Sequence, residues 1–439
     1  MKNKIFVIIF IVLCIIPTAL MLVPGTEGSD ANEAPKELPS LINTDGGLNI
    51  NYLSQFSEWF DNSIGLRSHM ISAHNKIIAS VFGESAEDKV ILGKDGWLFY
   101  TETLSDYKGT NLMSGREIYS ISRSLELIDE YCASRGINFA FTVAPNKNSL
   151  YGDKMPDSCF KSQKPTNAQL LTQQLSAADI NYINMFDAFG GESRPLYRKT
   201  DSHWTYEGAG LAADKLLTAL GKDFEPYFGG ETYQLNAKGD LHKMIYPALP
   251  DKDEEIRFTR ELSYEYTKPM RSVEDNFIYT HSEGKSGNLF MFRDSFGNTL
   301  HEYMANEFEN AVFCRLIPYN LTLAEQNGAD TLIIEIVERN LKWLIENPAV
   351  FAAPQRTPRK ARMQDITSIA SISCDIANEL DGYCKIEGSI PTDTIPDNSN
   401  IYITANGVTY EATPCGNGFT AYLPGRYTVD MLKIYSVQN

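Results

Sequence analysis

The pattern of hydrophobic and polar positions changes along the chain and divides it into three regions. A run without charged residues extends from Ile5 to Val23, directly after the basic start Met1-Lys2-Asn3-Lys4. From about residue 88 to 345, short apolar runs alternate with segments in which apolar residues recur every three or four positions. After residue 365, short segments alternate between apolar and polar residues, which is typical of strands.

The middle region predicts an α/β fold. Its apolar runs have the length of buried parallel strands, and the segments between them have the periodicity of amphipathic helices. Such alternation favours a mostly parallel sheet with helices on both faces, which binds ligands beyond the carboxyl ends of its strands. Residues 222–288 break the alternation, because they are rich in Tyr, Glu, Asp and Pro, and we interpret them as an inserted hairpin or lid.

The domain organisation follows from these patterns. We predict a signal anchor or signal peptide over 1–23, a linker over 24–48, a main domain over 49–349, a second linker over 350–364 and a small β-sandwich over 365–439. Asn406-Gly407 is expected to form a tight hairpin turn within the β-sandwich. We interpret the β-sandwich either as a carbohydrate-binding module or as a packing or spacer module.

A serine stands where a strand is expected to turn into a helix. Leu289 to Phe292 is a short apolar run, and the following Asp294, Ser295 and Gly297 are turn residues. Asn298 to Phe308 reads as a helix, so Ser295 would lie near a helix N-terminus. Free backbone N–H groups at such a place can activate a hydroxyl and stabilise an oxyanion. The alternative is an ordinary N-cap serine.

A histidine with a nearby carboxylate provides the other half of a nucleophilic site. The segment TDSHWTYEG runs from Thr200 to Gly208 and places Asp201 two residues before His203. A carboxylate at this spacing can accept the Nδ1 proton, which leaves Nε2 free to act as a base. A histidine beside a tryptophan can also be a packed core residue, but Asp201 and Ser295 together favour an Asp–His–Ser site.

These motifs resemble a known family. A D-x-H-W-[ST]-x-x-G motif followed by [RG]-D-S-F is similar to the SGNH hydrolase-like domain of alginate O-acetyltransferases, the AlgJ/AlgX and DHHW group. In ordinary SGNH hydrolases the nucleophile motif comes first, whereas Asp201 and His203 precede Ser295 here, as in the alginate group. Other segments that resemble the family are FSEWFDNSIGLR at 56–67, GKDGWLFY at 93–100, VAPNK at 143–147, GDL at 239–241 and EIVER at 335–339. The resemblance implies an SGNH or flavodoxin-like parallel sheet sandwiched by helices.

The resemblance also implies roles for individual residues. Ser295 would be the nucleophile, His203 the base and Asp201 the carboxylate that orients the base. The family uses a further side chain near the oxyanion, and the candidates in that region are Arg315, Tyr303 and Tyr319. Backbone amides near Ser295 and Gly297 would also hold the oxyanion.

Two residues at the end of the VAPNK segment have alternative interpretations. Asn146 stands where the family carries an acidic residue, and it is either an oxyanion-binding amide or a turn asparagine. Lys147 either holds an anionic sugar or is a solvated loop lysine.

The function that the resemblance implies is O-acetylation of a cell-surface or exported polysaccharide through an acyl-enzyme. The partners would be the polysaccharide acceptor and a membrane-bound O-acyltransferase that supplies acetyl groups. The same triad with water as acceptor would make a carbohydrate acetylesterase. A non-catalytic polysaccharide-binding or assembly protein is the third hypothesis.

Charge and cysteine content limit the ligands and the location. The formal net charge of −17 argues against nucleic-acid binding, because phosphates would be repelled. Residues 5–23 are near the minimum length of a membrane span, so we expect an anchor or a cleaved signal, with the main domain outside the cytoplasm. Six of the seven cysteines follow residue 30 and permit disulfides. The candidate pairs are Cys132 with Cys159 and two of Cys374, Cys384 and Cys415, whereas Cys314 is expected to be a buried thiol. The spacings fit no metal site, and we expect neither a metal nor another cofactor.

Overall fold

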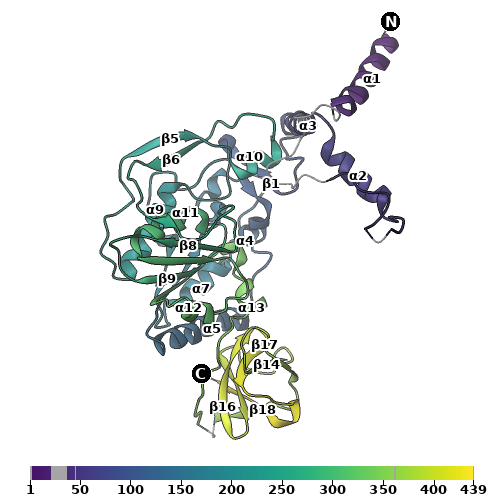
Figure 1. Ribbon diagram of the computed structural model, residues 1–439. Coiled ribbons are helices and arrows are strands. Elements are labelled where there is room, and N and C mark those ends of the chain that lie inside the picture. Colours follow the sequence, from purple (N-terminus) through teal and green to yellow (C-terminus); the bar gives the residue numbers. More distant parts are fainter. Residues whose placement is uncertain (1, 21–36, 45, 360–361, 439) are drawn as a thin grey trace.

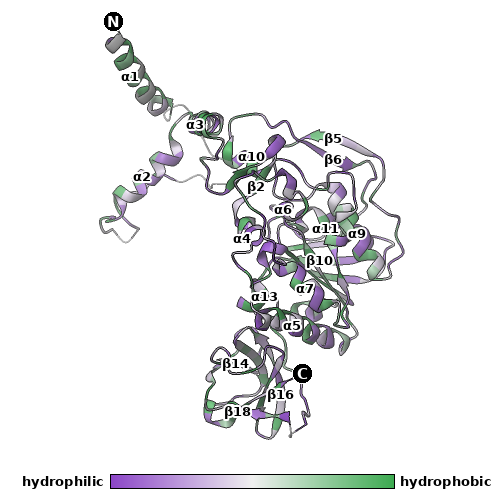
Figure 2. Ribbon diagram, turned by 180° about the vertical axis from the view of Figure 1, so that it is seen from behind, coloured by the Kyte–Doolittle hydropathy of each residue, from purple (hydrophilic) through white to green (hydrophobic). Residues whose placement is uncertain are grey.

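The computed structural model describes residues 2–20, 37–44, 46–359 and 362–438. An arm of helices α1 (Lys2–Leu20), α2 (Tyr52–Ser63) and α3 (Arg67–Phe82) lies at one end, a central α/β domain follows, and a β-domain lies at the other end (Figure 1). The linker predicted over 24–48 falls mainly outside the described residues. Apolar residues extend along α1 (Figure 2), but among the described residues no helix combines the length and hydropathy required to span a membrane.

The central domain is built on a seven-stranded sheet in the order β4-β3-β11-β9-β10-β8-β7. The first five strands are parallel, and β8 and β7 continue the sheet in antiparallel pairing. Every residue of β11 is buried, as expected for a strand covered on both faces. The prediction of an α/β fold is therefore confirmed. The strands are β3 (Asn138–Ala144), β4 (Tyr182–Ile183), β7 (Glu265–Tyr266), β8 (Phe277–His281), β9 (Asn288–Phe292), β10 (Asn310–Cys314) and β11 (Thr331–Val337).

Helices cover both faces of this sheet and enclose two hydrophobic cores. One core contains α8, α9 and α11, and the other contains α5, α7, α12 and α13. α5 begins at a capping box in which Ser114 and Glu117 each accept a hydrogen bond from the other's backbone N–H. The helices are α4 (Leu104–Lys108), α5 (Gly115–Ala133), α6 (Lys147–Leu150), α7 (Asn167–Leu175), α8 (Met185–Gly190), α9 (Tyr206–Ala219), α10 (Asp240–Ile245), α11 (Gly297–Glu307), α12 (Thr322–Gln326) and α13 (Trp343–Glu346).

The segment 222–288 is only partly an insertion. Its strands β5 (Thr232–Asn236) and β6 (Glu254–Phe258) form a separate antiparallel pair with α10 between them, which fits the predicted hairpin. Its last part contributes β7 and β8 to the central sheet. The prediction of an insertion is therefore wrong for the last part of this segment. β8 does alternate buried and partly exposed residues, but only over a few positions, so the alternation is too short to predict a strand from the sequence. A second small sheet of β1 (Val90–Leu92) and β2 (Leu98–Tyr100) packs against α10.

The C-terminal domain is entirely antiparallel. Its seven strands follow the order β12-β18-β15-β16-β17-β14-β13 in one curled sheet around its own core, rather than two separate layers. Asn406 and Gly407 both have positive φ, of 48° and 82°, and join β15 to β16 in the predicted tight turn. The strands are β12 (Gln364–Asp365), β13 (Ser371–Ile376), β14 (Tyr383–Ser389), β15 (Ser399–Ala405), β16 (Val408–Cys415), β17 (Gly418–Pro424) and β18 (Leu432–Gln438).

The β-domain is fixed to the central domain and is not tethered by a solvated linker. Arg116 of α5 is buried and donates to backbone carbonyls of Asp397, Ser399 and Gly416. The predicted linker over 350–364 is wrong in its first part, because Val350 and Phe351 are buried and residues 352 and 355 pair with strands of the β-domain. The apolar residues of this part, which include Val350 and Phe351, explain why it packs against the protein and is not solvated.

Candidate active site

The three residues of the predicted triad meet in space. His203 Nε2 lies 2.9 Å from Ser295 Oγ, and His203 Nδ1 lies 2.8 Å from Asp201 Oδ1. The His203 side chain is 25% exposed and the Asp201 side chain 14%, so the imidazole faces solvent while the carboxylate is largely enclosed. The arrangement lets a proton pass between the Ser295 hydroxyl and an imidazole that a carboxylate orients.

The loop that carries Asp201 and His203 is shaped by its own side chains. Asp201 Oδ1 also accepts the backbone N–H of His203 at 3.0 Å, which closes a tight turn two residues long. Thr205 then caps α9 by accepting the N–H of Gly208 at 3.0 Å. A Cβ at Gly208 would lie 2.5 Å from the carbonyl oxygen of Leu196, so only glycine allows this close approach.

Lys147 is buried beneath the loop that carries Asp201 and His203, binds its backbone, and is not available to a substrate. Its Nζ donates to the carbonyl oxygens of Arg198, Lys199 and Asp201 at 3.0, 3.0 and 2.6 Å. The side chain is 3% exposed, and burial lowers the pKa of Lys147 to about 7 although the charges of Asp201 and other carboxylates oppose this. The sequence suggested either a ligand for an anionic sugar or a solvated loop lysine. Both interpretations are wrong, because Lys147 is buried and its ammonium group donates its hydrogen bonds to three backbone carbonyls.

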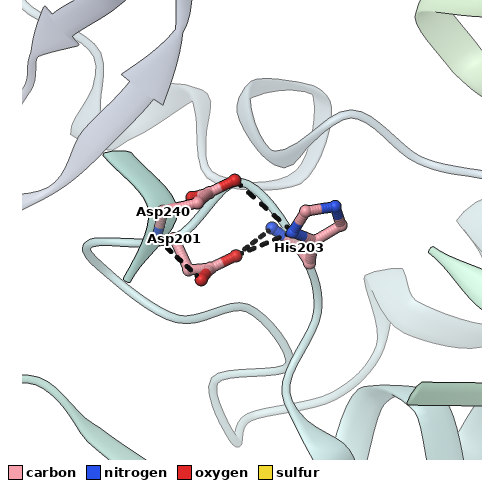
Figure 3. A group of neighbouring side chains, drawn as sticks. All are labelled: Asp201, His203 and Asp240. Atoms are coloured by element: carbon pink, nitrogen blue, oxygen red, sulfur yellow. Dashed lines mark hydrogen bonds and ion pairs between the residues drawn. The ribbon is translucent and has the colours of Figure 1, made fainter. Parts of the chain in front are cut away.

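A second carboxylate approaches the imidazole, and the sequence did not predict it. Asp240, the first residue of α10, places Oδ2 3.5 Å from His203 Nδ1, and its backbone N–H donates to Asp201 Oδ2 at 3.0 Å (Figure 3). Asp240 also accepts the N–H of Ser202 at 2.7 Å and the Ser202 hydroxyl. The only signal in the sequence was its place in the GDL segment that resembles the family.

The oxygens around His203 already have donors. Ligand atoms of Asp201, His203 and Asp240 lie within 4.8 Å of one another, a spacing that would suit a cation. A cation there would compete with the hydrogen bond from His203 Nδ1 to Asp201 and with the donors to Asp240. Arg198 Nη1 lies 3.6 Å from Asp201 Oδ2 and already supplies positive charge. The three residues therefore fit a proton relay better than a metal centre.

Burial and charge set the protonation of the relay. Burial would lower the pKa of His203, but the hydrogen bond and charge of Asp201, together with the charge of Asp240, raise it above its usual value. Burial would raise the pKa of Asp201, but its hydrogen bonds from His203 and the charge of the protonated ring hold it well below its usual range. Burial and the charge of Asp201 raise the pKa of Asp240. Asp201 thus stays ionised while His203 exchanges protons.

The nucleophile lies on the predicted turn between strand and helix. β9 ends at Phe292 and α11 begins at Gly297, so Ser295 lies at the carboxyl end of a parallel strand. Asp294 fixes the turn by accepting the N–H of Phe296 at 2.9 Å and that of Val337 at 2.8 Å. A Cβ at Gly297 would lie 2.6 Å from Cβ of Arg293, which explains the glycine.

The backbone at this turn offers donors for an oxyanion. The N–H of Phe296 is taken by Asp294, and that of Asn298 donates to the Ser295 carbonyl at 3.1 Å. The N–H groups of Ser295 and Gly297 at the start of α11 are therefore the backbone candidates, with the positive end of the helix dipole behind them.

The other predicted side chains are engaged elsewhere. Asn146 Nδ2 donates to Asp106 at 3.1 Å within a fully buried network, so it is not an oxyanion amide. Tyr303 is 3% exposed and packs on Tyr227 with ring centres 4.6 Å apart, so it belongs to the core between α9 and α11. Arg315 forms an ion pair with Glu274. The resemblance to the family suggested these roles, and the structure shows other partners for the three side chains.

One family model matches part of this chain. Residues 90–271 match the family model described as the SGNH hydrolase-like domain of the acetyltransferase AlgX. The match includes Asp201, His203 and Asp240, and Ser295 lies beyond its end. No match was found among curated proteins.

Several solved structures have a similar shape. PatB1 of Bacillus cereus with a sulfonyl adduct has 14% identity and a TM-score of 0.44, covering 57% of this chain and 97% of that one. A DHHW family protein from Eubacterium siraeum has 16% identity and a TM-score of 0.44, covering 60% and 99%. The O-acetyltransferase domain of Pseudomonas putida AlgJ has 17% identity and a TM-score of 0.39, covering 57% and 91%. At these values the likenesses carry no weight for function. The family match agrees with the resemblance seen in the motifs: residues 90–271 are similar to the SGNH hydrolase-like domain of the acetyltransferase AlgX.

Proposed function

We propose that the protein is an extracytoplasmic O-acetyltransferase that acetylates hydroxyl groups of a polysaccharide through an acyl-enzyme on Ser295. The observation that carries the proposal is the continuous relay from Asp201 through His203 to Ser295, with contacts of 2.8 and 2.9 Å. The family match over residues 90–271 supports acetyl transfer as the reaction class.

The geometry supports a two-step reaction. In the first step His203 Nε2 takes the proton of Ser295 Oγ as the oxygen attacks the acetyl carbonyl, and the amides of Ser295 and Gly297 hold the oxyanion. His203 returns the proton to the departing oxygen of the donor, which leaves an acetyl ester on Ser295. In the second step His203 takes a proton from a sugar hydroxyl, whose oxygen attacks this ester. The proton then returns to Ser295 Oγ as the acetylated sugar leaves.

The location and the donor belong to the same proposal. The basic start of the chain and the uncharged run from Ile5 to Val23 support export, with the central domain outside the cytoplasm. A membrane-bound O-acyltransferase would then deliver acetyl groups across the membrane, because acetyl donors of the cytoplasm do not reach an exported domain.

The test is transfer to sugar. Purified full-length protein is incubated with an activated acetyl ester, with and without oligosaccharides from the native host, and products are identified by mass spectrometry. Acetylated sugar that disappears in Ser295→Ala supports the proposal. Acetate release that no sugar affects, without acetylated sugar, would show an esterase. Absence of ester turnover together with polymer binding that survives Ser295→Ala would show a binding protein.

A further inference from the structure

A buried carboxyl group lies beside the turn that carries the nucleophile. Glu335 belongs to β11, the strand next to β9, and it is fully buried. Its Oε2 accepts the backbone N–H of Asp294 at 3.2 Å, and Asp294 directly precedes Ser295. The Asp294 carboxylate in turn accepts the N–H of Val337 of β11 at 2.8 Å. Glu335 and Asp294 thus join the Ser295 turn to β11 by hydrogen bonds in both directions.

The two arginines near Glu335 have other partners. Arg293 and Arg315 are close enough for their charges to act on Glu335. Arg293, however, donates to Asn298 at 2.6 Å and to two backbone carbonyls, and Arg315 forms an ion pair with Glu274. Glu335 Oε1 has no hydrogen-bond partner within the described part of the chain. A fully buried carboxylate without a bonded cation is costly, so this environment favours the neutral acid.

The groups that face Glu335 favour the same protonation state. Burial raises the pKa of Glu335 well above its usual value and the charge of Asp294 acts in the same direction, whereas the Asp294 N–H and the charge of Arg293 oppose the shift. Tyr197 and Tyr319 also face Glu335, and burial raises the pKa of both phenols well above their usual value, so they add no charge. A neutral carboxyl group has an O–H to donate, and the Asp294 carboxylate lies within its reach.

We propose that Glu335 is a positioning residue, which acts as a neutral acid and donates a hydrogen bond to Asp294, so that the turn holds Ser295 against His203. This inference rests on the proposed function, because it assigns a further residue to the same site. Asp294 Oδ1 accepts the N–H of Phe296 at 2.9 Å, so the position of Asp294 fixes the backbone on both sides of Ser295. A displaced turn lengthens the 2.9 Å contact between Ser295 Oγ and His203 Nε2. Glu335 therefore affects the chemical step and not the binding of the ester.

Two substitutions separate a neutral donor from a charge. Rapid mixing of the full-length protein with 4-nitrophenyl acetate measures the acylation rate at saturation and the ester concentration that gives half of this rate. Glu335→Met fills the space without a donor and should lower the saturated rate about tenfold or more at an unchanged half-saturation concentration, because a hydrogen bond to a charged group is lost. Glu335→Gln keeps a neutral donor and should retain the rate within about threefold. Equal losses in both variants, or a wild-type rate in Glu335→Met, overturn the inference.

The pH dependence of stability provides a second test, which holds even if Glu335→Met does not fold. A carboxyl group whose pKa is raised in the folded protein must take up a proton on folding, so its contribution to stability is lost as the pH rises above its unfolded pKa. Glu335→Gln needs no proton. Its urea midpoint should therefore rise relative to that of wild type between about pH 5 and about pH 8. A difference that stays constant or falls over this range overturns the inference.

A second buried glutamate is the matched control. Glu307 in α11 is also buried, but it pairs with Lys285 at 2.5 Å and with Arg260 at 3.3 Å. Glu307→Gln removes the charge that these cations require, so its urea midpoint should lie below that of wild type at both pH values, with acylation near the wild-type rate. A loss of stability of the same size in Glu335→Gln overturns the inference. Ester hydrolysis that persists in Ser295→Ala instead refutes the proposed function.

Discussion

A buried carboxylate joins the β-domain to α5, and removing this group should lower the free energy of unfolding of the protein. Glu411 in β16 has a side chain that is 1% exposed. It accepts from Arg123 Nε and Nη2 at 2.8 and 2.9 Å and from Arg356 Nε at 2.7 Å. The change Glu411→Ala leaves two arginines without their buried counter-charge.

The expected loss of stability depends on the ion pairs that each arginine keeps after the substitution. Removing one partner of a buried ion pair costs about 3–5 kcal/mol. Arg123 retains contacts with Glu126 and Glu130, and Arg356 retains Glu130. We therefore expect the lower end, a loss of about 3 kcal/mol in the free energy of unfolding.

Urea unfolding followed by circular dichroism measures the change. The matched control is Glu387→Ala in the same domain, where the side chain is 48% exposed and pairs with Lys385 at 2.9 Å. This control should cost less than about 1 kcal/mol, since exposed ion pairs contribute little. Glu411→Gln keeps the shape and one acceptor oxygen and should lie between the two. A loss for Glu411→Ala no larger than that of the control would refute the buried-pair reasoning.

Three further predictions concern the site and the cysteines. Lys147→Met should lower kcat on a small acetyl ester at least about tenfold, because three loop carbonyls each lose a donor worth about 1–3 kcal/mol; activity equal to wild type would contradict this. Asp240→Asn should lower the pKa of His203, because a carboxylate that favours the protonated ring is gone. Since the base acts unprotonated, the acidic limb of kcat/KM should move to lower pH, and an unmoved limb would show that Asp240 does not act on the ring. Cys374 and Cys384 bring their Sγ atoms within 2.7 Å, so peptide mapping of oxidised, unreduced protein should find this disulfide; alkylation of both thiols under denaturing, non-reducing conditions would exclude it.

Much of the site could be predicted because its signals are local. The apolar run before Asp294 is adjacent in the chain to the turn residues around Ser295, and Asp201 and His203 are only two residues apart. Short-range spacing of this kind fixes which side chains one loop can present. The joining of the two motifs, 92 residues apart, rested on the resemblance to a family and on the sheet topology expected for an α/β fold.

The rest depends on contacts between distant segments. Asp240 contacts His203 from the start of a helix that follows a loop of little periodicity, so no spacing in the sequence predicts this contact. Lys147 is a surface type of residue, and only three carbonyls from residues 198–201 make its burial tolerable.

Distance also explains the errors about the cysteines and the linker. Cys132 packs in the core on one side of the sheet and Cys159 against the core on the other side, so the predicted pair cannot form. Cys314 is buried, as predicted. Residues 350–364 looked like a solvated linker because of their prolines and arginines, yet Arg356 forms an ion pair with Glu411 in the β-domain.

The central claim is that Ser295 carries the acetyl group during the reaction. Rapid quenching of the full-length protein with an activated acetyl ester, followed by peptide mass spectrometry, tests it most directly. The account predicts one added acetyl group on the peptide that contains Ser295, formed far more slowly in His203→Ala and absent in Ser295→Ala, since the relay of 2.9 and 2.8 Å activates this hydroxyl. Turnover of the ester that continues in Ser295→Ala, or an acetyl group found reproducibly on another residue, would contradict the account.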